Sequence, residues 1–141
     1  MATKPDFTEE EWKTLQKGVT GAGMLVSVGD VDFTDSFGEA TKLAKYLGEQ
    51  REKSESQFVR ELATTRGTGF GMTSSRQEIE AETLDALRSA IATLAVKAPD
   101  EVEHYRRLVV GTATAVAEAK GEVEAGEADA IAKIKEVLGS A

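Results

Sequence analysis

Apolar residues recur at helical spacing along most of this chain, and that periodicity limits the possible folds more than any other feature. One stretch near the N-terminus places apolar side chains every three or four positions, at Trp12, Leu15, Val19, Ala22 and Val26. This spacing puts the side chains on one face of a helix, whereas a half-buried strand would alternate at every second position. No stretch alternates convincingly in that way, so the sequence predicts an all-α fold.

Residues that cap helices mark the predicted boundaries. A serine or threonine at the N-cap accepts a hydrogen bond from a backbone amide of the first turn, and a glycine commonly follows the last turn. The predicted starts are Thr8 with Glu11, Thr34, Ser75 with Glu78, and Pro99 with Asp100, and the predicted ends are Gly48, Gly67 and Gly139. The first helix is expected over residues 9–28. We therefore predict a compact bundle of five to six helices.

The same periodicity predicts which side chains face the core. A short third helix should bury Phe58, Val59 and Leu62. The long helix after it should bury Ile79, Thr83, Ala86, Leu87, Ala90, Ile91, Leu94 and Ala95. The last two helices should bury Val102, Tyr105, Leu108, Val109, Thr112, Ala113 and Val116, and then Ile131, Ile134, Val137 and Leu138. Each of these helices thus has an apolar face for a common core.

Length and composition limit the classes of function. With 141 residues the chain has the size of one domain, so we predict a single helical domain over residues 1–141. The absence of cysteine excludes disulfides and fits a reducing compartment, and we predict a cytoplasmic location. No apolar stretch has the length of a membrane span, so no membrane insertion is expected. The net charge of -8 repels phosphate backbones, so nucleic acid is not an expected partner.

Two predicted helices contain glycine among small residues, in the stretches "KGVTGAGMLVSVG" and "RLVVGTATAVAEA". An interior glycine costs a helix about 1 kcal/mol relative to alanine, and the close approach of a neighbouring helix would offset that cost. We therefore predict that these two helices form the central, most buried pair. The alternative is a small-molecule-binding bundle, in which an apolar cavity lies between the glycine-lined helices.

Acidic residues gather in two short stretches. The first stretch, "VSVGDVDFTDSFGEA", contains Asp30, Asp32 and Asp35. The second stretch contains Glu122, Glu124 and Glu127. Divalent cations such as Ca²⁺, Mg²⁺ or Mn²⁺ take carboxylate oxygens as ligands, although this spacing is not that of an EF-hand. Acids in turns and first helical turns also serve capping and solvation alone. Both a divalent-cation site and a pair of solvated turns remain open.

The two acidic stretches belong to similar segments, 25–48 and 115–139. Each segment runs from an apolar helix end through an acidic turn, then an apolar residue, Phe33 or Val123, to an amphipathic helix that ends in Leu-Gly. The likeness predicts two pseudo-symmetric helical hairpins.

The stretch "VAEAKGEVEAGEADAIAKIKEVLG" resembles the closing segment of the tellurite-resistance TerB-like family, and segment 24–48 resembles the first such unit of that family. Lys120 stands where the second turn of the family carries aspartate. The resemblance implies an all-helical bundle, a divalent cation at the acidic turns, and a role in stress response and tellurite resistance.

No catalytic pattern is recognisable in the sequence. His104 is the only histidine, and no serine lies in a nucleophile-elbow pattern. The glycine-rich stretch Gly67–Thr73 lacks the Lys-Ser/Thr of a phosphate-binding loop. We therefore predict a non-enzymatic protein. A metal-free interaction or scaffolding module, which acts on a protein partner or by self-association through its helical surface and the Gly67–Thr73 loop, is the other alternative.

Overall fold

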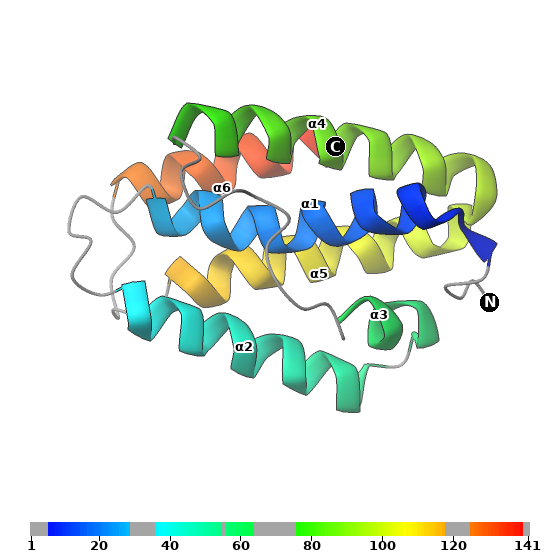
Figure 1. Cartoon of the computed structure of the whole chain (residues 1–141), viewed down its shortest axis with the longest axis horizontal. Helices are drawn as coiled ribbons and strands as arrows, with labels where there is room; N and C mark the ends of the chain where they lie inside the picture. The colour runs from blue at the N-terminus through cyan, green and yellow to red at the C-terminus, as the bar shows by residue number, and fades with distance from the viewer. Residues whose placement is uncertain (1–5, 29–35, 55, 64–75, 118–124, 140–141) are drawn as a thin grey trace.

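Six α-helices and one short 3₁₀ helix, η3, make up the described part of the chain (Figure 1). The computed structural model describes residues 6–28, 36–54, 56–63, 76–117 and 125–139. The elements are α1 (Glu9–Val28), α2 (Ser36–Lys53), α3 (Gln57–Leu62), α4 (Arg76–Lys97), η3 (Pro99–Glu101), α5 (Val102–Ala117) and α6 (Ala125–Val137). The predicted all-α bundle is confirmed.

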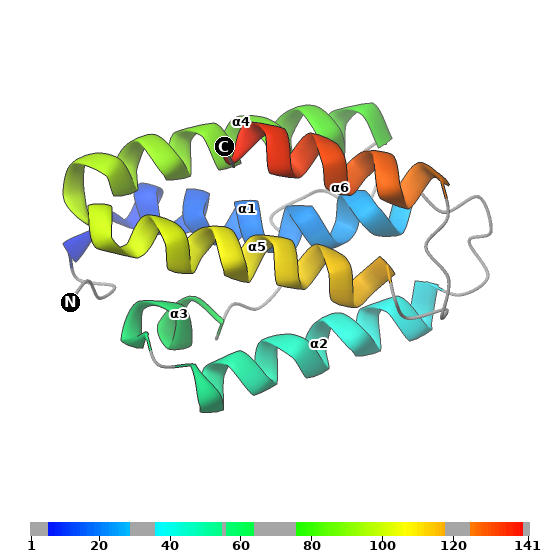
Figure 2. The ribbon, with the colours of Figure 1, turned by 180° about the vertical axis from the view of Figure 1, so that it is seen from behind.

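Helices α1 and α5 lie side by side through the middle of the bundle. Helices α4 and α6 cover them on one side, and α2 and α3 cover them on the other (Figures 1 and 2). α1 packs most extensively against α4 and then against α5, and α5 also contacts α2 and α6. The prediction that the two glycine-containing helices form the central pair is confirmed.

The helix pairs α1–α2 and α5–α6 are arranged alike. α1 and α5 run in the same direction, and each packs against the second helix of the other pair, so that α1 contacts α6 and α5 contacts α2 (Figure 2). Matching positions of the two central helices are buried, namely Leu15 and Tyr105, Val19 and Val109, and Val26 and Val116. The two predicted hairpins therefore share one core rather than forming separate cores.

Tyrosine side chains occupy the space that two glycines leave open. Tyr105 of α5 lies against Gly18 of α1, and its hydroxyl donates a hydrogen bond to the Leu15 carbonyl oxygen at 2.8 Å. Tyr46 of α2 lies against Gly111 of α5 in the same manner. A methyl group at either glycine would overlap the tyrosine hydroxyl. At these two positions glycine therefore serves close packing, and tyrosine side chains fill the space that the small-molecule-binding alternative would need for a cavity.

Most of the predicted core faces are buried, including the five apolar residues of α1 and the predicted face of α5 apart from the half-buried Val102. Two predictions are wrong. Gly48 does not end a helix, because α2 continues to Lys53 through a run of residues with good helix propensity. Ala95 is exposed, because the buried face of α4 passes through Leu94 at that turn. Gly139 does follow the last turn, with a φ of 69°.

An aromatic cluster holds α3 against the central helices. The Phe58 ring of α3 lies with its centroid 5.7 Å from Phe7, 5.9 Å from Trp12 and 6.4 Å from Tyr105. Phe7 and Trp12 therefore pack at one end of the bundle, whereas Phe33 lies outside the described residues. Because Phe58 is fully buried, this cluster fixes the position of the residues at the start of α3.

Candidate functional site

The acidic residues predicted to bind a cation lie outside the described residues. This holds for Asp30, Asp32, Asp35, Glu122 and Glu124, as it does for the Thr34 and Ser75 caps and the Gly67–Thr73 loop. The backbone of Glu127 lies in the first turn of α6, but its side chain is outside the described part. Within the described ranges, no three histidine, aspartate or glutamate side chains gather closely enough to hold a metal ion.

The described helix ends that flank the two acidic stretches lie at one end of the bundle. α1 ends at Val28 and α5 ends at Ala117, while α2 begins at Ser36 and α6 begins at Ala125. Both views of the ribbon place these four helix ends together, at the left of Figure 1 and the right of Figure 2. The described helix ends that border residues 29–35 and 118–124 therefore lie at the same end of the molecule.

A buried carboxylate lies toward the opposite end, where α3 meets α5. Glu101 of η3 is 4% exposed, and its Oε2 accepts a hydrogen bond from the Ser56 hydroxyl at 2.7 Å. Its Oε1 lies 3.4 Å from Nδ1 of His104, an ion-pair distance, although Nδ1 makes no hydrogen bond in the described structure. A buried carboxylate is costly unless such partners surround it. Ser56 and His104 therefore supply the polar surroundings of Glu101.

Local sequence explains how these three residues come together. Pro99 begins a 3₁₀ turn, which the Glu101 amide closes by donating a hydrogen bond to the Ala98 carbonyl at 2.9 Å. His104 follows three residues later, so the two side chains lie on the same face of the helix. Ser56 caps α3, and its Oγ accepts a hydrogen bond from the Val59 amide at 3.3 Å.

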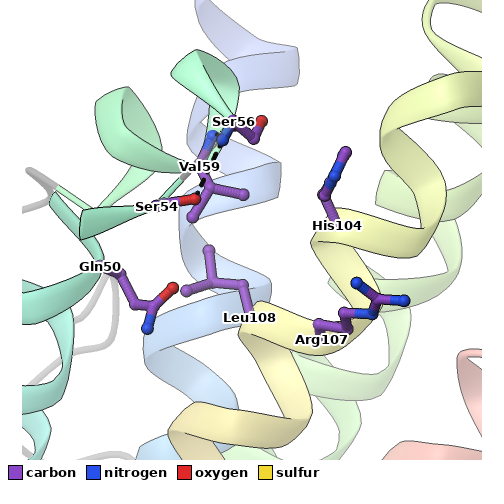
Figure 3. Close-up of a pocket in the computed structure, with 7 residues that line it drawn as sticks. All are labelled: Gln50, Ser54, Ser56, Val59, His104, Arg107 and Leu108. Carbon is purple, nitrogen blue, oxygen red and sulfur yellow. Dashed lines mark hydrogen bonds between the residues drawn. The ribbon is translucent and has the colours of Figure 1, made fainter.

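An open pocket of about 220 Å³ lies beside this cluster (Figure 3). It is lined by Gln50, Ser54, Ser56, Val59, His104, Arg107 and Leu108. Figure 3 shows His104 and Arg107 on α5 at one side of the pocket, Gln50 and Ser54 at the other, and the apolar pair Val59 and Leu108 between them. The pocket therefore combines a small apolar floor with polar groups on two sides.

A second, more open groove runs between α4 and α6. Its lining includes Glu80, Leu84, Arg88, Lys133, Glu136 and Val137. Lys133 Nζ lies 2.6 Å from Glu80 and 3.3 Å from Asp129. Its hydrogen bond to Glu80, and to a smaller extent its hydrogen bond to Asp129, raises the pKa of Lys133. Because its central charge is already paired across the groove, this site offers less to a ligand than the His104 pocket.

The Glu101 cluster does not follow from the sequence. No sequence pattern gives His104 a catalytic role, and neither Ser56 nor Glu101 stands out from its neighbours. The hydrogen bond between Ser56 and Glu101 joins residues that are 45 positions apart, and neither residue belongs to a recognisable motif. Only Ser56 had a usable signal, since a serine before an apolar helix start is a common N-cap.

Comparisons with protein-family models, with curated proteins and with solved structures found no match to this chain. The resemblance to the TerB-like family therefore stays a prediction. No helix in the described ranges combines the length and the apolar character needed to cross a membrane.

Proposed function

We propose that this protein is a non-enzymatic, TerB-like, stress-associated protein that acts in the cytoplasm and binds a divalent cation at the end of the bundle where its two acidic segments attach. The observation that carries the proposal is the common location of the four described helix ends, Val28, Ser36, Ala117 and Ala125. A hard cation needs six or more oxygen ligands. One short turn with three aspartates supplies only three of them if each aspartate contributes one oxygen. A fold that attaches both acidic segments at one end favours a joint site.

The contacts of Ser56 are those of a structural residue rather than a catalytic one. A catalytic serine donates its proton to a general base that faces the substrate. The Ser56 hydroxyl instead caps α3 and is hydrogen bonded to a carboxylate that is itself buried. Its contacts are those of a residue that holds α3 against η3.

The interaction-module alternative has less support from the described surface. Val96, 83% exposed, is the one large apolar side chain that is exposed in the described ranges. Stable interfaces usually contain a contiguous apolar centre. A partner that binds the described surface would have to bind it mainly through polar contacts.

The cation proposal is tested by thermal unfolding after removal of metal with a chelator, with and without Ca²⁺, Mg²⁺ or Mn²⁺. A cation at 100 times its dissociation constant should stabilise the fold by about 2.7 kcal/mol. The triple variants Asp30→Ala, Asp32→Ala, Asp35→Ala and Glu122→Ala, Glu124→Ala, Glu127→Ala should each lose this effect, because each removes half of the proposed ligands.

A matched control removes three exposed acids elsewhere, with Glu52→Ala, Asp100→Ala and Glu136→Ala, and should keep the stabilisation. No stabilisation by any of the three cations at millimolar concentration would contradict the proposal. An equal loss in the control would show that only net charge matters.

A further inference from the structure

The pocket beside His104 presents unused hydrogen-bond donors, while most of its acceptors are already engaged. The Ser54 Oγ accepts a hydrogen bond from the Ser56 amide at 3.2 Å, and the Ser56 Oγ accepts one from the Val59 amide. Glu101, which would repel an anion, lies buried behind Ser56 and His104, and both its oxygens face those residues. The charge of Glu101 is therefore covered by Ser56 and His104.

The donors come from two helices. In the described structure, the Ser54 hydroxyl has no acceptor and the Gln50 side-chain amide has no partner. The Arg107 guanidinium contacts only Glu103, with its Nε 3.6 Å from that carboxylate, so its two terminal nitrogens are unpaired in the described part. Since Nδ1 of His104 faces Glu101, Nε2 is the ring nitrogen left for a ligand.

From this arrangement we propose that the pocket binds a small oxyanion, a carboxylate or phosphate group, between Arg107 and His104 on one side and Ser54 and Gln50 on the other. Guanidinium groups bind such anions through charge-assisted, often bidentate hydrogen bonds. The pocket volume of about 220 Å³ is below the usual range for larger ligands, so the ligand is a small one. Val59 and Leu108 provide an apolar floor for a short carbon chain.

Because His104 is the only histidine, the Hε1 proton of its imidazole gives a single NMR signal next to the pocket. The protein is titrated with sodium phosphate and separately with sodium succinate, at constant ionic strength and in the presence of a chelator. We expect a saturating shift of the His104 signal with at least one of the two. Saturation by phosphate assigns the site to a phosphate group, and saturation by succinate assigns it to a carboxylate. The chelator keeps this result independent of the proposed cation site.

Variants separate a specific site from general charge attraction. Arg107→Gln should weaken binding about tenfold, the effect of losing one hydrogen bond to a charged group, and Ser54→Ala should weaken it less. Arg88→Gln is the matched control, because Arg88 is likewise exposed and paired with an acid of its own helix, and it should leave binding unchanged.

Two results would overturn the proposal. One is a His104 signal that shifts linearly, without saturation, with both anions. The other is an equal loss of affinity in the Arg107→Gln and Arg88→Gln variants, which would reduce the effect to overall charge.

Discussion

At the scale of single residues, the two contacts between tyrosine and glycine explain why helix-breaking residues are tolerated in the centre of this bundle. The Tyr105 hydroxyl reaches the backbone of α1 only because Gly18 has no side chain. The hydrogen bond that results is fully buried, and burial raises the pKa of Tyr105, so the phenol stays neutral and remains a donor. The helix propensity lost at Gly18 is offset by this packing.

Alanine substitutions at two glycines should have opposite effects on stability. Gly18→Ala should lower the free energy of unfolding by about 1–3 kcal/mol, because the new methyl group overlaps the Tyr105 hydroxyl and comes within 2.9 Å of Leu87. Gly48→Ala should raise it by about 0.5–1 kcal/mol, because Gly48 lies within α2 and has open space around it. Urea unfolding monitored by circular dichroism measures both changes.

A double-mutant cycle tests the assigned cause. In a Tyr105→Phe background the overlapping hydroxyl is absent, so Gly18→Ala should cost less than it does in the wild type. Equal costs in the two backgrounds would mean that Tyr105 is not what excludes a side chain at residue 18.

At the scale of helices, a single side chain joins the start of α1 to the end of α4. Glu11 accepts a hydrogen bond from the Thr8 amide at 2.8 Å, and its own amide donates to Thr8 Oγ1 at 3.1 Å, which completes the predicted capping box. The same carboxylate lies 2.5 Å from Lys97 Nζ in the last turn of α4. The pKa of Glu11 lies below its usual value. The hydrogen bond with Lys97 is the largest cause, and the hydrogen bond with the Thr8 amide is the next.

This lowered pKa predicts a contribution to stability that depends on pH. Because the pKa of Glu11 is lower in the folded state than the unfolded value of 4.5, the contribution is present above that value and is lost as pH falls through the folded pKa. The difference in free energy of unfolding between the wild type and Glu11→Gln should therefore be constant near neutral pH and shrink below about pH 4.5.

The control for this experiment is Glu10→Gln, which removes an acid from the same helical turn but touches neither the capping box nor Lys97. Denaturant unfolding across the acid range measures both variants. A difference for Glu11→Gln that stays constant down to the lowest pH at which the protein folds would argue against the proposed linkage.

At the scale of the whole molecule, one core connects all the helices. Its buried residues come from both central helices and from each covering helix, for instance Leu47 of α2, Leu87 of α4 and Ile134 of α6. Helices that share one core cannot separate without exposing it, so the chain should unfold as a unit.

Three probes of unfolding should therefore give the same midpoint. Trp12, the only tryptophan, reports on the aromatic end of the bundle, far-ultraviolet circular dichroism reports on all helices, and the His104 NMR signal reports on the pocket. Coincident urea transitions are expected for a single domain. A Trp12 transition separate from the helical one would instead divide the chain into two cooperative units.

The helix positions and most of the core faces follow from the sequence, because a helix and its apolar face are specified by residues three or four positions apart. The first capping box and the buried face of α5 are examples, and both were predicted. The exception at Gly48 has the same origin, since a glycine tolerated within a helix looks identical in sequence to one that ends it. The acidic stretches proposed to bind a cation were also found by local pattern alone.

The polar pocket, the burial of Glu101 and the fit of Tyr105 onto Gly18 were decided by the tertiary structure. The hydrogen bonds that define them join residues 45 and 90 positions apart. Nothing in the local sequence of Glu101 distinguishes it from the exposed acids around it, because its burial depends on where the aromatic cluster places α3. Local pattern determined which segments of this protein are helices, and the packing of those helices determined which polar side chains meet.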